Sequence, residues 1–180
     1  VIDDDIADGG FAGKLVAEAG WYRLEVRALM NGDATERGIT DGVGIGEVFM
    51  AAGQYNSANY GQTKLTPEDG RVCSGDFSSG WKTGGDPLTG AAGSGGSPWP
   101  ALGDFLAARF DVPIGFVSVG INTGRVTEWQ PGHLRNYFAR LINGAALLGV
   151  NGARMLLWHQ GETDALNSTS TADYARQLTD

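Results

Sequence analysis

Three short apolar runs narrow the choice of fold, because each is followed at once by a polar, glycine-bearing loop. The runs cover residues 47–52, 114–119 and 153–158, and helical patterns at residues 100–110 and 133–148 separate them. Short apolar runs that alternate with amphipathic helices are typical of a parallel sheet with helices on its faces. We therefore predict an α/β domain of three layers, with a parallel sheet between two layers of helices.

The segment before this domain has a different pattern. Apolar and charged side chains alternate along residues 22–27, and Asn31-Gly32-Asp33 is typical of a hairpin turn. We interpret residues 1–45 as the tail of an accessory β-domain and residues 46–180 as the N-terminal part of the α/β domain. Residues 54–100 show no periodicity, which favours a long structured loop or a set of short surface elements.

Composition excludes several classes of protein. The chain has 180 residues, a formal net charge of −8 and scattered basic residues, so nucleic acid is not an expected partner. The apolar runs are too short to cross a bilayer, and we expect no membrane partner. One cysteine and two histidines allow no internal disulfide and supply too few ligands for a zinc site. We therefore expect neither a metal nor a cofactor.

The polar loops after the three runs carry the candidate site. They contain Gly53-Gln54-Tyr55-Asn56, Asn122-Thr123-Gly124 and His159-Gln160-Gly161-Glu162. Carboxyl ends of parallel strands meet at one edge of a sheet, and amides and backbone N–H groups there can stabilise an anionic oxygen. Each loop alone also fits ordinary turn chemistry, and His159 fits a packed histidine as well as a functional one. Glu162 and Asp164 fit the role of negative charges at a helix N-terminus.

Taken together, the loops resemble the SGNH hydrolase superfamily, specifically its sialate O-acetylesterase and acetylxylan esterase-like branch. The first loop matches that family's Gly-Gln-Ser-Asn block except at Tyr55, and Trp158-His159-Gln160-Gly161-Glu162-Thr163 matches its Trp-x-Gln-Gly-Glu-Ser/Thr block throughout. The run Gly96-Ser97-Pro98-Trp99-Pro100 ahead of a helix is also similar to members of this branch. The resemblance implies removal of acetyl groups from a sugar by a serine that a histidine activates.

Three departures bear on that chemistry. Tyr55 stands at the position of the nucleophilic serine, and a bulky phenol is a poor replacement for a small hydroxymethyl group. Ser57 is not a substitute, because a shift of two residues on a tight loop points its side chain elsewhere. In the second block, Gly124 is displaced by one or two positions when counted back from Trp129. The family's Asp-x-x-His block occurs nowhere in the 180 residues, so we expect a chain that is incomplete at its C-terminus.

Two functional readings stay open, besides a fragment with no function of its own. The first is a carbohydrate O-acetylesterase-like hydrolase that acts on an acetylated carbohydrate or another small ester, its fold completed by a second chain or segment. The second is a catalytically silent relative that binds glycans in the same cleft. The resemblance favours a secreted or periplasmic protein. The expected site comprises the nucleophile position Tyr55, the oxyanion or substrate-orienting residues Asn56, Gly124, Gln160 and Glu162, and the substrate-binding residues Gln54, Trp129 and His159.

Overall fold

A computed structural model describes residues 13–76, 78–146, 148 and 151–179. Its contacts divide the chain into two units, Val1–Ile45 and Gly46–Asp180. The first twelve residues of the β-rich segment predicted from the sequence lie outside the described residues.

The first unit is a long antiparallel hairpin, β1 (Gly20–Met30) and β2 (Asp33–Ile45). Asn31 and Gly32 form its turn, and both have positive φ, as two-residue hairpin loops require. The pairing shifts register between Tyr22 and Leu24 and again between Ala28 and Leu29, so the strands carry two irregularities. The hairpin predicted for this segment is therefore present, and its role as the tail of a larger β-domain stays a prediction.

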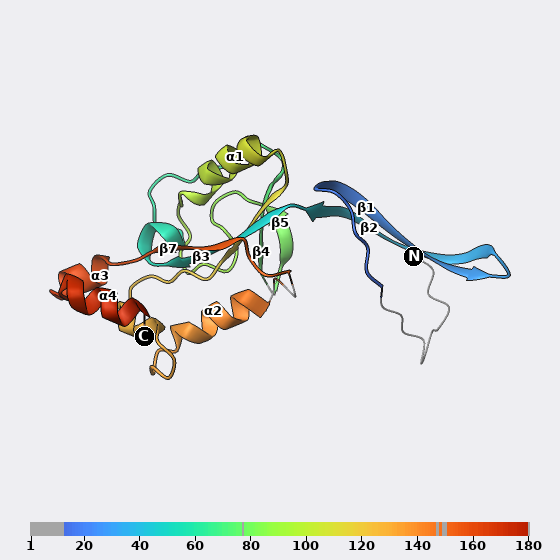
Figure 1. Ribbon diagram of the computed structural model, residues 1–180. Coiled ribbons are helices and arrows are strands. Elements are labelled where there is room, and N and C mark those ends of the chain that lie inside the picture. The colour runs from blue at the N-terminus through green and yellow to red at the C-terminus, as the bar shows by residue number, and fades with distance from the viewer. Residues whose placement is uncertain (1–12, 77, 147, 149–150, 180) are drawn as a thin grey trace. The chain divides into compact units, whose positions relative to one another are not determined.

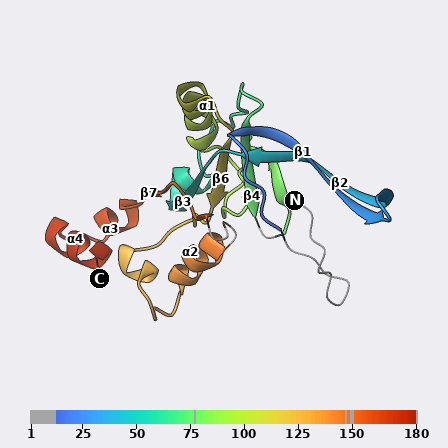
Figure 2. The ribbon, with the colours of Figure 1, turned by 45° about the vertical axis from the view of Figure 1, so that its right-hand side comes forward.

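The second unit is built around a five-stranded sheet with the order β5-β4-β6-β3-β7 (Figures 1 and 2). The strand β3 (Glu47–Gly53) lies between β6 (Ile114–Ser118) and β7 (Met155–His159), and all three run parallel. These strands coincide closely with the three predicted runs. The α/β class predicted from the sequence is confirmed.

The two longer helices of this unit cover opposite faces of the sheet (Figure 1). Alternate side chains of β3 explain this arrangement, because Phe49 and Ala51 face α1 (Trp99–Phe110) while Met50 and Ala52 face α2 (Tyr137–Ala146). The core on the α1 side also includes Val72, Leu88, Ile114 and Phe116, and the core on the α2 side includes Val119, Ile121, Trp129 and Trp158. Burying one such large side chain contributes about 1.5–3 kcal/mol.

Three features differ from the prediction. The segment expected to be loop contains two strands, β4 (Val72–Asp76) and β5 (Gly80–Thr83), and β4 joins the sheet beside β6. Since β5 pairs antiparallel with β4, the sheet is mixed rather than wholly parallel. The helix expected from residue 133 begins only at Tyr137, after a turn in which Asn136 has positive φ.

Short elements follow the three central strands and shape the loops. Within the described ranges they are two 3-10 helices, η2 (Tyr55–Ala58) after β3 and η3 (Val126–Trp129) after β6, and two α-helices, α3 (Glu162–Leu166) and α4 (Thr171–Thr179), after β7. The first of these elements begins soon after β3 and β7, whereas a longer loop separates η3 from β6.

Candidate functional site

The three loops meet at the carboxyl edge of the sheet, as the sequence predicts. Gln54 forms a parallel bridge with Ile121, and its N–H donates to the His159 carbonyl at 2.9 Å. The N–H of Tyr55 donates to the Asn122 carbonyl at 3.3 Å. Because β3 lies between β6 and β7, the loop after it contacts both other loops directly.

Tyr55 lies at the junction of these loops in an unusual backbone conformation. Its φ is +50°, in the left-handed region, and its side chain is partly buried. Asn56, the next residue, is exposed. The Ser57 hydroxyl is buried and donates to the carbonyls of Gln54 at 2.8 Å and His159 at 3.2 Å. Ser57 therefore serves the loop backbone, which agrees with its exclusion as a nucleophile.

The side chains of Gln54 and Gln160 lie next to each other. Gln54 is 0% exposed, and its Oε1 accepts from Nε2 of Gln160 at 3.2 Å. Nε2 of Gln160 also lies 2.8 Å from the carbonyl oxygen of Gly124 and 2.6 Å from Oδ2 of Asp164. The amides thus connect the first loop to the other two.

Asp164 is a buried carboxylate, whereas the sequence predicts only a negative charge at a helix N-terminus. It is 2% exposed, and its Oδ2 also accepts from the Val126 N–H at 2.9 Å. Its Oδ1 accepts from the Thr169 hydroxyl at 3.1 Å. Asp164 therefore fastens the loop after β7 to the loop after β6. Gln160 precedes α3, so no helical spacing in the sequence signals this contact.

Gly124, expected to offer an N–H to an oxyanion, uses that N–H within the protein. It donates to the Thr163 hydroxyl at 3.3 Å, which is a long and weak hydrogen bond. The N–H groups of Asn122 and Thr123, just before it, have no acceptor within the described residues, and both residues are exposed. The second loop therefore has N–H donors available one or two positions before Gly124.

His159 and Glu162 lie at the solvent side of the third loop. Nδ1 of His159 is 3.8 Å from Oε1 of Glu162, and both side chains are roughly half exposed. The distance permits an ion pair when the histidine is protonated but is too long for a hydrogen bond. Both residues are therefore accessible to a ligand, as the predicted substrate contact of His159 requires.

Trp129, predicted to contact substrate, is 5% exposed. Its ring packs edge-on against Trp158, with centroids 5.0 Å apart, and against Tyr137 at 5.5 Å. The indole is thus almost wholly covered by protein, and stacking on a sugar would require these contacts to be exchanged. The Tyr174 hydroxyl, on α4, accepts from the indole of Trp158 at 3.1 Å and donates to the carbonyl of Gln160 at 3.3 Å. Tyr174 therefore supports the third loop from outside, and its sequence position carried no signal.

Buried polar atoms without a hydrogen-bond partner concentrate in these loops. Buried polar atoms normally find partners, and those that do not often mark functional sites. Most of the exceptions in the described part of the chain belong to the three loops; they are Gln54 Nε2, Glu128 Oε2, Trp129 Nε1, Gln160 Oε1 and Glu162 Oε2. They include both donors and acceptors.

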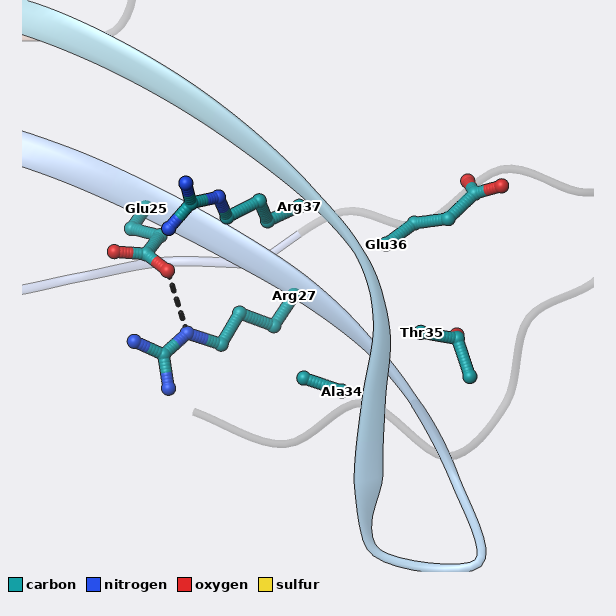
Figure 3. A pocket seen from close by; sticks show the side chains of 6 residues that line it. All are labelled: Glu25, Arg27, Ala34, Thr35, Glu36 and Arg37. Atoms are coloured by element: carbon teal, nitrogen blue, oxygen red, sulfur yellow. Dashed lines mark hydrogen bonds and ion pairs between the residues drawn. The ribbon is translucent and has the colours of Figure 1, made fainter.

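A hollow of about 340 Å³ lies on the hairpin of the first unit (Figure 3). Its lining is largely charged, and Arg27 donates to Glu25 at 2.6 Å while Arg37 lies opposite Arg27 on the neighbouring strand. The Arg27 side chain, through its hydrogen bond, lowers the pKa of Glu25. The hollow is solvent-exposed and holds no buried reactive group among its lining residues, so the three loops remain the candidate functional site.

Among residues 13–76, 78–146, 148 and 151–179, no three His, Cys, Asp or Glu side chains gather closely enough to hold a metal ion. In the same ranges no helix has the length and apolar character that spanning a bilayer requires.

Comparison with one solved structure supports the fold. A crystal structure of a protein from Arabidopsis thaliana is 18% identical and has a TM-score of 0.59, over 74% of this chain and 66% of that chain. A structure described as a novel carbohydrate acetylesterase from Xanthomonas citri is also 18% identical and has a TM-score of 0.49, over 80% of this chain and 41% of that chain. The chain thus spans just under two thirds of the Arabidopsis protein and less than half of the Xanthomonas protein.

Comparison of the sequence identifies the family. No curated protein matches the chain. A family model described as carbohydrate esterase, sialic acid-specific acetylesterase, matches residues 45–180, which is the second unit and includes all three loops. The match covers well over half of the chain, and the resemblance inferred from the loop motifs is confirmed. The chain belongs to this family of carbohydrate esterases, the sialic acid-specific acetylesterases.

Proposed function

We propose that the three loops bind an O-acetylated carbohydrate and that residue 55 occupies the nucleophile position of an acetyl-ester hydrolase. The observation that carries this proposal is the backbone of Tyr55. A residue other than glycine in the left-handed region costs about 1–2 kcal/mol, and such conformations cluster at functional sites. Here the conformation occurs where all three loops converge, directly after the central strand.

The chemistry of the loops is compatible with ester hydrolysis except at one position. The N–H groups of Asn122 and Thr123 and the adjacent amides offer donors for the negative charge that develops on an ester oxygen. Tyr55 lacks the small hydroxyl that attacks an acyl carbon in a serine esterase. We therefore expect hydrolysis to require serine at position 55.

The test compares the natural full-length polypeptide that contains this sequence with its Tyr55→Ser variant. Hydrolysis of an aryl acetate and of an O-acetylated sialic acid is measured, and we expect the serine variant to be at least about 100-fold faster. Tyr60→Ser is a matched control, because Tyr60 lies on the same loop but is exposed. Thermal unfolding establishes that each protein is folded. If a folded Tyr55→Ser variant hydrolyses neither ester above background, the hydrolase proposal is wrong.

Glycan binding without turnover is a second candidate, which Tyr55 itself favours. Its side chain is partly buried, and its hydroxyl has no hydrogen-bond partner in the described part of the chain, so both the ring and the hydroxyl are available to a ligand. Calorimetric titration with acetylated and de-acetylated sialic acid tests this candidate. We expect the unsubstituted protein to bind the acetylated sugar without hydrolysing it, and Tyr55→Ala to weaken binding. Equal affinity for the two sugars, or an unchanged affinity in Tyr55→Ala, would contradict it.

A further inference from the structure

The surroundings of Gln160 determine which way its amide points. One terminal atom of this side chain is within 3.2 Å of three oxygens, those of the Asp164 carboxylate, the Gly124 carbonyl and the Gln54 amide. Oδ2 of Asp164 already accepts from the Val126 N–H, and none of the three oxygens has a hydrogen to donate. Only nitrogen is compatible with three acceptors, so this atom is Nε2.

The hydrogens of that nitrogen are fully used. An amide nitrogen carries two hydrogens. The two shortest contacts of Gln160, 2.6 Å to Asp164 and 2.8 Å to Gly124, use both, and the longer contact to Gln54, at 3.2 Å, shares one of them. The hydrogen bond to the carboxylate is charge-assisted and is therefore the stronger one. Gln160 thus has no N–H left for a ligand, and its Oε1 is a buried acceptor without a partner.

Gln54 has the opposite arrangement. Its Oε1 faces Nε2 of Gln160, so its own Nε2 points away from that contact. This nitrogen belongs to a side chain that is 0% exposed, and it has no hydrogen-bond partner in the described residues. The two adjacent amides therefore leave one donor, from Gln54, and one acceptor, from Gln160.

We propose that Asp164 is a positioning residue that turns Gln160 into a hydrogen-bond acceptor, and that Gln54 supplies the amide N–H of the site. The assignment rests on the proposed function for its ligand, an acetylated sugar. The sequence predicts instead that Gln160 stabilises an oxyanion or orients the substrate and that Gln54 binds substrate. The acceptor on Gln160 suits a sugar hydroxyl, while the donor on Gln54 suits an ester oxygen.

A purely structural role of Asp164 is the alternative. Asp164 also holds the Val126 N–H and the Thr169 hydroxyl, so its removal destabilises the loops whatever Gln160 does. Loss of stability alone does not separate the two roles. The side-chain amide hydrogens of Gln160 do, because their exchange with solvent reports on their own hydrogen bonds.

The first experiment measures exchange of glutamine side-chain amides by nuclear magnetic resonance. The chain has five glutamines, and Gln62 is an exposed internal control. In the unsubstituted protein we expect both Nε2 hydrogens of Gln160 to exchange at least about 10-fold more slowly than those of Gln62. Exchange as fast as that of Gln62 would overturn the assignment without any variant.

Two substitutions at Asp164 complete this experiment. In Asp164→Asn, the amide oxygen can still accept from Gln160 and Val126, and its nitrogen can donate to the Thr169 hydroxyl after that hydroxyl turns. We therefore expect slow exchange at Gln160 to be retained in Asp164→Asn and lost in folded Asp164→Ala. Fast exchange in the asparagine variant, or slow exchange in the folded alanine variant, would overturn the role of Asp164.

The second experiment adds an O-acetylated sialic acid to the unsubstituted protein. We expect the Nε2 resonances of Gln54 to shift on binding while those of Gln160 stay in place. A shift of the Gln160 resonances without one at Gln54 would overturn the proposed roles. If no glutamine resonance shifts, the proposed function is contradicted, whereas the exchange rates still decide the orientation of Gln160.

Discussion

Replacing Gly53 by alanine tests whether the site depends on close contact between β3 and β7. Gly53 has a φ of +124°, a region that side chains rarely enter, and a Cβ there would lie 1.8 Å from the carbonyl oxygen of His159. The backbone of His159 cannot move aside as the end of a flexible side chain could, so β3 and β7 must separate. That carbonyl accepts from the Gln54 N–H and the Ser57 hydroxyl, so separation affects both hydrogen bonds.

The expected cost follows from these contacts. Backbone strain at such a φ contributes about 2 kcal/mol, and each lost hydrogen bond contributes about 1 kcal/mol. We therefore expect Gly53→Ala to lower the free energy of unfolding by about 4 kcal/mol, which is exceptional for a single methyl group. Gly132→Ala is the matched control, because Gly132 has a φ of +81° but nothing lies within 4 Å of its added Cβ. There we expect only the strain, about 1–2 kcal/mol.

Guanidinium unfolding followed by tryptophan fluorescence measures both costs. Trp158 and Trp129 pack together close to the Gly53 loop, so their emission reports on unfolding of this region. The m-values of the variants are compared as well, because a changed m-value would show that the substitution altered the unfolded state. Costs for Gly53→Ala and Gly132→Ala that agree within about 0.5 kcal/mol would refute the contact between the strands as the cause.

Three further predictions concern the α/β unit. Burial raises the pKa of the Cys73 thiol to about 11, so Ellman's reagent at pH 7.5 should label it at least about 100-fold more slowly in the native protein than in urea. The hydroxyl and N–H of Ser79 lower the pKa of Asp76 to about 2, so the carboxylate stabilises the fold above about pH 4 and this contribution is lost as the pH falls toward 2. Asp76→Asn should flatten the fall of the unfolding midpoint over that pH window. The Trp99 indole donates to the Ser57 carbonyl at 2.8 Å, and Trp99→Phe should cost about 2 kcal/mol in denaturant unfolding.

The sequence predicted the central strands because their signal is local. Residues 47–52 and 114–119 are continuous apolar runs, and both form strands that are buried almost throughout. The signal for β4 and β5 was weak, since each is short and both lie in a segment rich in glycine and serine. β4 enters the sheet by pairing with β6, about forty residues away in sequence, and no local pattern reports such a pairing.

The sequence also predicts only those features of the site that depend on local patterns. Strand ends placed Gln54, Tyr55 and Gln160 at one edge of the sheet, and the structure joins their loops by hydrogen bonds. Burial was not predictable from residue type, because Trp129 fits a sugar platform and a core residue equally well, and the structure buries it. The role of Asp164 was also hidden, since one of its partners, Val126, is 38 residues away in sequence.

The side chain of Tyr55 makes no hydrogen bond between the loops, which determines how cleanly position 55 can be tested. The hydrogen bonds between loops include those of the Gln160 amide, the Asp164 carboxylate, the Ser57 hydroxyl and the backbone of residue 55. The Tyr55 hydroxyl makes none within the described residues, and its ring is partly exposed. A serine at this position keeps the backbone hydrogen bonds and removes only the ring contacts. Activity gained by Tyr55→Ser would therefore reflect the new hydroxyl rather than a rebuilt loop, and loss of folding in that variant would show that the ring has a packing role.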